Sequence, residues 1–340
     1  MARYKFTAKR IIIIALSVMI FFHTLSLRAI GIDGTHSAQN AIDKMRQGFY
    51  DFSESIDILE YGIHKDELRA IFASATKNDP YLFFVGNTLS YYCRSDGIVV
   101  SVKPSYNMER DEAERAVKYC REKVNQIAQF AKRGENELER ALLAHDHLCL
   151  TFQYDLTLQN DNIYDFFRSG RGTCQGYAWA YMAVLRELEI DARYVASDTV
   201  NHIWTLVKID GEWYHSDVTW DDPPSGEGGD GVSRRHFLCS DQKAQKQGHR
   251  DWYSQDGTKC LSAEYDETDF APLVHTRVWG DADHSYSLTL CDLIIMRKML
   301  DGRTDSHIYT CISCAETDGD RALTRADVEK LRRRLLEAYG

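Results

Sequence analysis

The sequence predicts an α+β protein, and three features of the chain support this prediction. A helical stretch from Gln175 to Leu188 follows a glycine-bracketed segment that ends at Cys174. Two stretches of alternating apolar residues, 201–210 and 212–220, are joined by Asp210-Gly211, a pair typical of a two-residue hairpin turn. The C-terminal part of the chain has acidic loops that precede helical patterns. We therefore expect a helix packed against an antiparallel sheet, followed by a small all-α domain.

The composition is that of an ordinary soluble globular protein. Of the 340 residues, 44% are hydrophobic and 27% are charged, and the chain is long enough for more than one domain. The net charge is −10, and no basic cluster lies near aromatic residues. Both facts argue against a nucleic-acid partner.

The N-terminal segment has the composition of a secretory signal peptide. Basic residues between positions 3 and 10 precede the apolar run 11–22, and Ala29 offers a small residue for cleavage. We expect residues 1–29 to be removed and the mature protein to be secreted, with no membrane contact after cleavage. An uncleaved anchor is the alternative, because no charge interrupts residues 11–27.

Residues 30–106 predict an N-terminal α+β subdomain. Helical spacing covers 38–50 and 66–76, and apolar runs at 80–85 and 97–106 predict two strands. We interpret this part as a packing subdomain.

The core, predicted for residues 107–270, contains the candidate nucleophile. Two helical patterns, 111–132 and 136–149, lead to Cys174, which lies between glycines at the start of a helix. The helix dipole and the free N–H groups at a helix start favour a thiolate over a thiol.

The predicted hairpin supplies a base and an acid for this cysteine. If Ile209 pairs with Glu212 across the turn, His202 and Asp217 lie on one face as diagonal neighbours. The imidazole can then activate Cys174, and the carboxylate can orient the imidazole. The sequence thus predicts a Cys–His–Asp triad.

Three runs of sequence resemble the transglutaminase-like superfamily, in particular its bacterial secreted branch, which shares the core of papain-like cysteine proteases. The runs are GTCQGYA at 172–178, HIWTLV at 202–207 and WYHSDVTWDDP at 213–223. The resemblance implies a papain-like transglutaminase core with Cys174, His202 and Asp217 as catalytic residues. It also implies a cysteine acyltransferase or cysteine peptidase that needs no cofactor for catalysis.

The expected substrate is a protein or peptide. The sulfur would attack a carboxamide or peptide carbonyl and form a thioester, while the Cys174 N–H contributes to the oxyanion hole. Gln153 is a candidate for the second oxyanion donor. A lysine amine that resolves the thioester would crosslink proteins, whereas water would give a deamidase or peptidase, and the sequence leaves these outcomes open. The alternative of a different class is a catalytically silent binding module on a scaffold. No pair of carboxylates stands out for glycoside hydrolysis.

The cysteine count fits one reactive thiol. Nine cysteines, an odd number, suit an exported protein with one cysteine unpaired. Cys239 and Cys260 flank one loop and could bridge, and the rest of the pairing stays open. Cys311 and Cys314 have the spacing of a zinc knuckle, but no second pair completes a zinc site.

An internal repeat occupies the C-terminal module, predicted for residues 271–340. Residues 281–292 and 316–327 each precede a helical pattern and carry oxygen-bearing side chains at positions one, three, five and twelve. The predicted calcium ligands are Asp281, Asp283, Ser285, Asp292, Glu316, Asp318, Asp320 and Asp327.

This duplicated pattern resembles a type I dockerin, the module that docks bacterial enzymes on the cohesin domains of a cellulosome scaffold. The resemblance implies structural calcium, a cohesin partner, association with the cell surface through the scaffold, and a place in polysaccharide catabolism. Tyr286 and Arg321 stand where a calcium loop normally has glycine. A helical hairpin without metal therefore remains the alternative.

Overall fold

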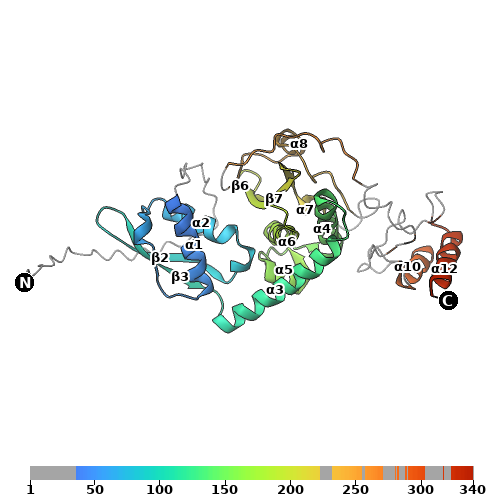
Figure 1. Cartoon of the computed structure of the whole chain (residues 1–340), viewed down its shortest axis with the longest axis horizontal. Coiled ribbons are helices and arrows are strands. Elements are labelled where there is room, and N and C mark those ends of the chain that lie inside the picture. The colour runs from blue at the N-terminus through green and yellow to red at the C-terminus, as the bar shows by residue number, and fades with distance from the viewer. Residues whose placement is uncertain are drawn as a thin grey trace, which may run out of the picture. The chain divides into compact units, whose positions relative to one another are not determined.

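The computed structural model describes residues 36–222, 232–254, 257–270, 290–302 and 323–339, together with single residues 280, 282, 288 and 317. The chain forms two compact units, Met1–Tyr119 and Cys120–Gly340 (Figure 1). The boundary falls inside helix α3 (Arg110–Ala131), C-terminal to the boundary of 106/107 that the sequence predicted. The predicted signal segment, residues 1–29, lies outside the described residues. Of the helices that the structure describes, none has the length and apolarity needed to cross a membrane.

The N-terminal unit combines two helices with a three-stranded antiparallel sheet of order β1-β3-β2. Its elements are α1 His36–Tyr50, β1 Ile56–Asp57, the 3-10 helix Leu59–Tyr61, α2 Leu68–Lys77, the 3-10 helix Pro80–Leu82, β2 Val85–Cys93 and β3 Val99–Tyr106. The helices lie where their spacing predicts them, because Met45, Phe49 and Ile71 are buried on their inner faces.

The predicted strand at 80–85 is wrong, and the chemistry of one cap explains the error. The Asp79 side chain accepts a hydrogen bond from the Tyr81 N–H, and Pro80 occupies the first helical position. Both features favour a helical turn over a strand. The strand begins only at Val85, and the sequence analysis did not predict its extent to Cys93.

The second unit is built around helix α6 and a four-stranded antiparallel sheet of order β8-β7-β6-β9. Its elements up to residue 254 are α4 Glu137–Thr151, β4 Gln153–Tyr154, α5 Ile163–Ser169, β5 Arg171–Gly172, α6 Cys174–Glu187, β6 Ala192–Ser197, β7 His202–Ile209, β8 Glu212–Ser216, α7 Val218–Asp221, α8 Asp241–Gln247 and β9 Trp252–Ser254. Helix α6 packs against β7, and all of its residues from Gly176 to Leu185 are buried. Each large apolar side chain buried there contributes about 1.5–3 kcal/mol, so the start of α6 is held firmly.

The hairpin prediction is confirmed in its register and wrong in its length. Ile209 pairs with Glu212, and the turn residues Asp210 and Gly211 have φ values of 49° and 88°. These positive φ values match the right-handed twist of the strands. Strand β8 ends at Ser216 rather than at residue 220, because Asp217 caps α7.

Two helices form the described part of the C-terminal module, α10 (Leu290–Leu300) and α12 (Arg325–Tyr339). They pack on each other through a small apolar core that contains Ile295, Met296, Val328, Leu331 and Leu335. Helix α10 begins within the predicted loop 281–292 and α12 within the predicted loop 316–327, and most of both loops lies outside the described residues.

Candidate functional site

Cys174 is the first residue of the buried helix α6, and its side chain is partly exposed. Thr173 is extended just before the helix, and Gly170 ends α5 with a φ of 73°. At Gly172 a Cβ atom would lie 2.3 Å from the Phe166 ring, so only glycine fits. The chain thus turns sharply between two helices and places the thiol at a helix N-terminus that solvent reaches.

The loop 155–162 lies against this turn. The Thr173 N–H donates to the Asn160 carbonyl at 2.9 Å, and the Gln175 side chain donates to the Asp161 carbonyl at 2.7 Å. The Asp155 carboxylate organises the loop, since it accepts hydrogen bonds from the backbone N–H groups of Thr157, Gln159 and Asn160. The hydrogen bond from the Thr157 hydroxyl, together with these backbone bonds, holds the pKa of Asp155 well below its usual range.

The segment before this loop carries the predicted oxyanion residue. Gln153 is exposed and pairs with Arg171 in the short parallel ladder of β4 and β5. The next residue, Tyr154, is 38% exposed, and burial together with the nearby Cys174 raises the pKa of its phenol. Tyr154 pairs with Gly172, two residues before Cys174, and Gln153 has no contact with the sulfur among those that the structure describes.

His202 and Asp217 meet as the register predicts. The His202 Nε2 atom lies 2.7 Å from Asp217 Oδ2, and both side chains are buried. Burial lowers the pKa of His202, but the Asp217 charge, the bond to Asp217 and the Cys174 thiol outweigh it and raise the pKa to about 10. Because Nε2 faces the carboxylate, Nδ1 is the ring nitrogen that remains for the thiol.

The Asp217 carboxylate is saturated with donors. Its Oδ1 accepts the N–H groups of Thr219 and Trp220 at 3.1 and 3.2 Å. Its Oδ2 accepts His202 and also His249, whose Nε2 lies 2.8 Å away. Burial opposes ionisation, yet the charge of His202 and these bonds hold the pKa of Asp217 well below its usual range.

His249 is the member of this cluster that the sequence analysis missed. It is 1% exposed, and the centre of its ring lies 4.5 Å from that of Trp204 and 4.2 Å from that of Trp220. The run His249-Arg250-Asp251-Trp252, which leads into β9, is the signal in the sequence, but nothing in it predicts a bond to Asp217.

A second buried cluster of ionisable groups lies between α4, α7 and the segment 232–240. His145 Nδ1 is 2.9 Å from Asp146 and its Nε2 is 3.2 Å from Asp221. Arg234 bonds Asp146 at 2.7 Å, and His236 bonds Asp221 at 2.9 Å. Burial disfavours charge on His145, but its neighbours, Cys149 and both carboxylates, raise its pKa well above the ordinary value. The sequence analysis did not predict this cluster.

Two groups of described residues have the composition of a metal site. The first is His202, Asp217 and His249, in which both Nε2 atoms already donate to the carboxylate. The second is His215, Asp241 and Cys260. Here the Trp204 indole donates to His215 Nδ1 at 2.9 Å, so the proton of the neutral ring is on Nε2, which faces Asp241. Both arrangements are those of hydrogen-bonded, proton-bearing imidazoles.

The remaining cysteines of the described chain are thiols. Cys239 and Cys260, which the sequence suggested as a bridge, are both buried and free. Burial raises the pKa of Cys239 to about 12. Cys311 and Cys314 lie outside the described residues.

Of the predicted calcium ligands, the structure describes Asp292 and Asp327, and both are buried. The Asp327 carboxylate accepts four hydrogen bonds, from the N–H and hydroxyl groups of Thr317 and Thr324. A calcium ion bound by Asp327 would have to replace some of these donors. The other ligands, Asp281, Asp283, Ser285, Glu316, Asp318 and Asp320, lie outside the described residues.

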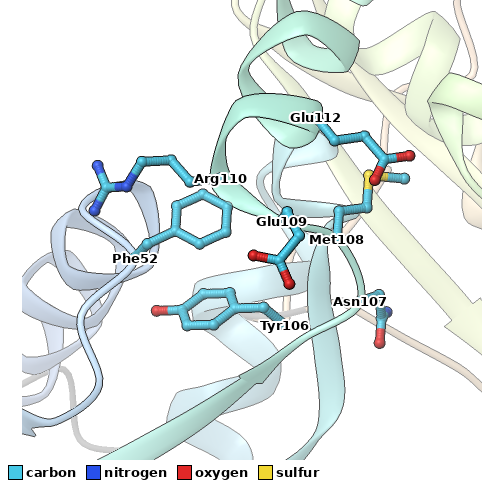
Figure 2. A pocket seen from close by; sticks show the side chains of 7 residues that line it. All are labelled: Phe52, Tyr106, Asn107, Met108, Glu109, Arg110 and Glu112. Carbon is cyan, nitrogen blue, oxygen red and sulfur yellow. The ribbon is translucent and has the colours of Figure 1, made fainter.

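A pocket of about 560 Å³ opens in the N-terminal unit (Figure 2). The Phe52 and Tyr106 rings stack at 4.6 Å on one side of it, and the Arg110 guanidinium lies 5.3 Å from the Phe52 ring. The pocket holds no cysteine or histidine, so it lacks the groups for acyl transfer.

Comparisons with solved structures give matches at low sequence identity. Among solved structures, similarity extends to a TGase at 13% identity and a TM-score of 0.28, over 45% of this chain and 48% of that one. A candidate cysteine protease from Cytophaga hutchinsonii is 15% identical with a TM-score of 0.27, over 49% and 72% of the two chains. A candidate protease from Parabacteroides distasonis is 14% identical with a TM-score of 0.26, over 53% and 35%. The match thus spans less than half of the TGase, and no curated protein matches the chain.

The family model of the transglutaminase-like superfamily matches residues 123–218. This segment contains Cys174, His202 and Asp217, and it ends before His249. The chain therefore carries a transglutaminase-like superfamily domain.

Proposed function

We propose that the protein is a cysteine-dependent acyltransferase or hydrolase acting on carboxamide or peptide bonds of proteins, with Cys174 as nucleophile. The observation that carries this proposal is the 2.7 Å bond between His202 and Asp217, with the Cys174 thiol as a further partner of the same ring. Histidine takes the proton of the thiol, and the buried carboxylate stabilises the resulting imidazolium.

The chemistry follows from the positions of these groups. The thiolate attacks the carbonyl carbon, and negative charge develops on the carbonyl oxygen beside the start of α6, where the first N–H groups have no partner within the helix. His202 then gives its proton to the departing nitrogen, which leaves as ammonia or an amine, and a thioester to Cys174 remains. An amine or a water molecule attacks the thioester after His202 removes its proton, and the thiol is restored.

Tyr154 supports a site that accepts an extended chain. Tyr154 is 38% exposed and pairs with Gly172, two residues before Cys174, and Leu156 and Leu158 on the following loop are 87% and 63% exposed. Apolar side chains at the rim of a site favour protein substrates over small polar amides.

The experiment offers the full-length protein a glutamine-containing peptide and a labelled primary amine. Amine incorporation indicates crosslinking, ammonia release without incorporation indicates deamidation, and a shortened peptide indicates proteolysis. Each product must disappear in Cys174→Ala, while Cys149→Ala is the matched control and keeps it. Absence of all three products across a varied peptide panel, with a Cys174 thiol no more reactive than an exposed one, would support the silent binding module instead.

For the C-terminal module, we propose calcium-dependent docking of residues 271–340 on a cohesin domain outside the cell. The duplicated acidic pattern and the packed pair α10 and α12 support this proposal. The second loop offers Glu316, Asp318, Asp320 and Asp327, whereas the first has the neutral Ser285 at position five. Calcium affinity rises with the number of charged ligands, so the second loop should bind at lower calcium.

Binding of the full chain to a type I cohesin is measured with calcium and with a chelator. Asp318→Ala should weaken docking more than Asp283→Ala, and deletion of 281–340 should abolish docking and spare the chemistry at Cys174. Docking that survives the chelator would instead indicate a metal-independent hairpin, and failure to dock in calcium would refute the cohesin partner.

A further inference from the structure

His249 is bonded to the oxygen of Asp217 that His202 also uses. The two Nε2 atoms lie 2.7 and 2.8 Å from Oδ2, while Oδ1 is held by two backbone N–H groups of α7. Without His249, Oδ2 would have His202 as its single side-chain donor among the contacts that the structure describes. The acid of the triad is therefore held on both oxygens by groups that take no part in the chemistry.

The surroundings of His249 indicate that its imidazole is not simply filling space. Its Nδ1 is buried and has no hydrogen-bond partner in the described structure. A buried polar atom without a partner costs free energy, and an apolar side chain of similar volume would avoid that cost. The nitrogen that does make a bond, Nε2, points at Asp217.

The ring of His249 is also fixed in direction. Trp204 and Trp220 both contact it, and Trp220 stacks on His202 as well, with ring centres 4.9 Å apart and an interplanar angle of 14°. The centres of the two imidazoles that share the carboxylate lie 6.1 Å apart, and Trp220 contacts both rings. This packing keeps the Nε2–H of His249 aimed at Oδ2 while the His202 ring gains and loses its Nδ1 proton.

We propose that His249 is a positioning residue that fixes Asp217 Oδ2, and through it the ring of His202, for activation of Cys174. A carboxylate that accepts four donors neither rotates nor takes the proton of His202 when that ring becomes charged. The inference rests on the proposed function of Cys174. It adds a fourth side chain, from outside the matched family segment, to the group formed by Cys174, His202 and Asp217.

The test measures alkylation of Cys174 by iodoacetamide in the full-length protein, because this rate reports thiol activation and needs no substrate. Peptide mass spectrometry follows Cys174 and, as an internal reference, the exposed Cys291. His249→Leu removes the donor and should slow alkylation of Cys174 about tenfold, the effect of losing one charge-assisted hydrogen bond. His249→Gln, whose amide reaches the position of Nε2, should restore the rate to within about threefold.

A double-mutant cycle separates positioning from packing. In an Asp217→Asn background, His249→Leu should change the rate less than about twofold, because the partner of its bond is already altered. His147→Leu is the control: it removes another imidazole, on helix α4, whose ring centre lies 5.1 Å from that of Phe130, and should not slow alkylation. If His249→Leu does not fold, His249→Asn replaces it, since the shorter amide cannot reach Oδ2.

The outcomes are distinct. A rate for His249→Leu equal to wild type, a Gln variant as slow as the Leu variant, or an equal loss in the Asp217→Asn background would each overturn the positioning role. Wild-type Cys174 that reacts no faster than Cys291 would contradict the proposed function itself, whatever the variants do.

Discussion

Two of the groupings of cysteine, histidine and aspartate in the described part of the second unit, around Cys149 and around Cys174, can be compared directly, and we propose chemistry for the second alone. The Cys149 Sγ atom lies 4.0 Å from Nε2 of His145, and His145 forms hydrogen bonds with Asp146 and Asp221. This cluster therefore contains the same three residue types as the site at Cys174. Yet Cys149 lies inside helix α4, is fully enclosed, and has a pKa that burial raises to about 12. Cys174 lies at the first position of a helix and reaches solvent.

With Cys174 as the proposed nucleophile, access and helix position, rather than residue types, distinguish it from the buried thiol of Cys149. In the cluster around His145, two carboxylates are balanced by Arg234 and a doubly bonded imidazole, which is the arrangement of a buried ion network. Breaking such a network by removing one partner is costly, so this cluster fixes the fold behind the site.

The largest expected difference between the two groupings is in activity. Cys174→Ala should reduce acyl transfer at least about 10³-fold, because no other group replaces the nucleophile. Cys149→Ala should leave the turnover within about twofold and lower the free energy of unfolding by about 1–2 kcal/mol. Turnover and urea denaturation of both variants provide the check, and equal losses of activity would erase the distinction.

The two carboxylates should also respond differently to amidation. Asp217→Asn should lower turnover by about 10²- to 10⁴-fold with the fold intact, since the residue orients His202 and does not attack. Asp221→Asn should instead lower the free energy of unfolding by about 3 kcal/mol, because the negative charge between His145 and His236 is lost and one of the two accepting oxygens becomes a donor. Steady-state kinetics normalised to folded protein separates the two effects.

The free energy of unfolding should depend on pH through the titration of His145 and His202. The pKa values of His145 and His202 are raised, so their stabilisation is complete below about pH 6.5 and is lost as pH rises, for His202 through about 10. Asp217 and Asp221 have lowered pKa values, so their stabilisation is present above about pH 4 and is lost as pH falls. His202→Gln should remove about 2 kcal/mol of the alkaline decline, as measured by unfolding between pH 6.5 and 10. An unchanged slope would show that His202 is not charged in the folded protein.

The ionisation of Asp222 should have the smallest effect on the free energy of unfolding. This effect should be destabilising, whereas the ionisation of Asp217 is stabilising. Burial raises its pKa to about 7, against the bonds from Tyr177 and Tyr154 that lower it. The folded state therefore favours the protonated acid, and ionisation above about pH 4 costs stability that grows up to about pH 7. Asp222→Asn should add about 1 kcal/mol to the free energy of unfolding at pH 8 and nothing at pH 4. A loss of stability at pH 8 would show that the charge of Asp222 is needed.

The contacts that the sequence predicted are those fixed by local chemistry. The Asp210-Gly211 turn determines the register, and the register brings His202 to Asp217 over a separation of 15 residues. The bond from His249 spans 32 residues and depends on how the closing segment folds back beside β6, which no turn signal specifies.

The errors in the sequence analysis have equally local causes. The apolar run after Asp79 has the composition of a strand, but the side-chain cap of Asp79 and the position of Pro80 favour a helical turn. The same competition ended β8 early, because Asp217 caps α7. The cluster at His145 could not be predicted, since its partners come from three separate segments with no shared spacing.

The two-residue turn between β7 and β8 sets a limit on length variation in this protein. Side chains alternate between the faces of a strand. A residue inserted at Asp210-Gly211 while the two-residue turn is kept would shift the pairing of β8 by one position, and would move its side chains, and Asp217 after them, to the opposite face. Insertions in exposed loops elsewhere carry only a small entropic cost. Homologous chains that keep this chemistry should therefore vary in length almost anywhere on the surface except at this turn, where even one added residue would separate the base from its acid.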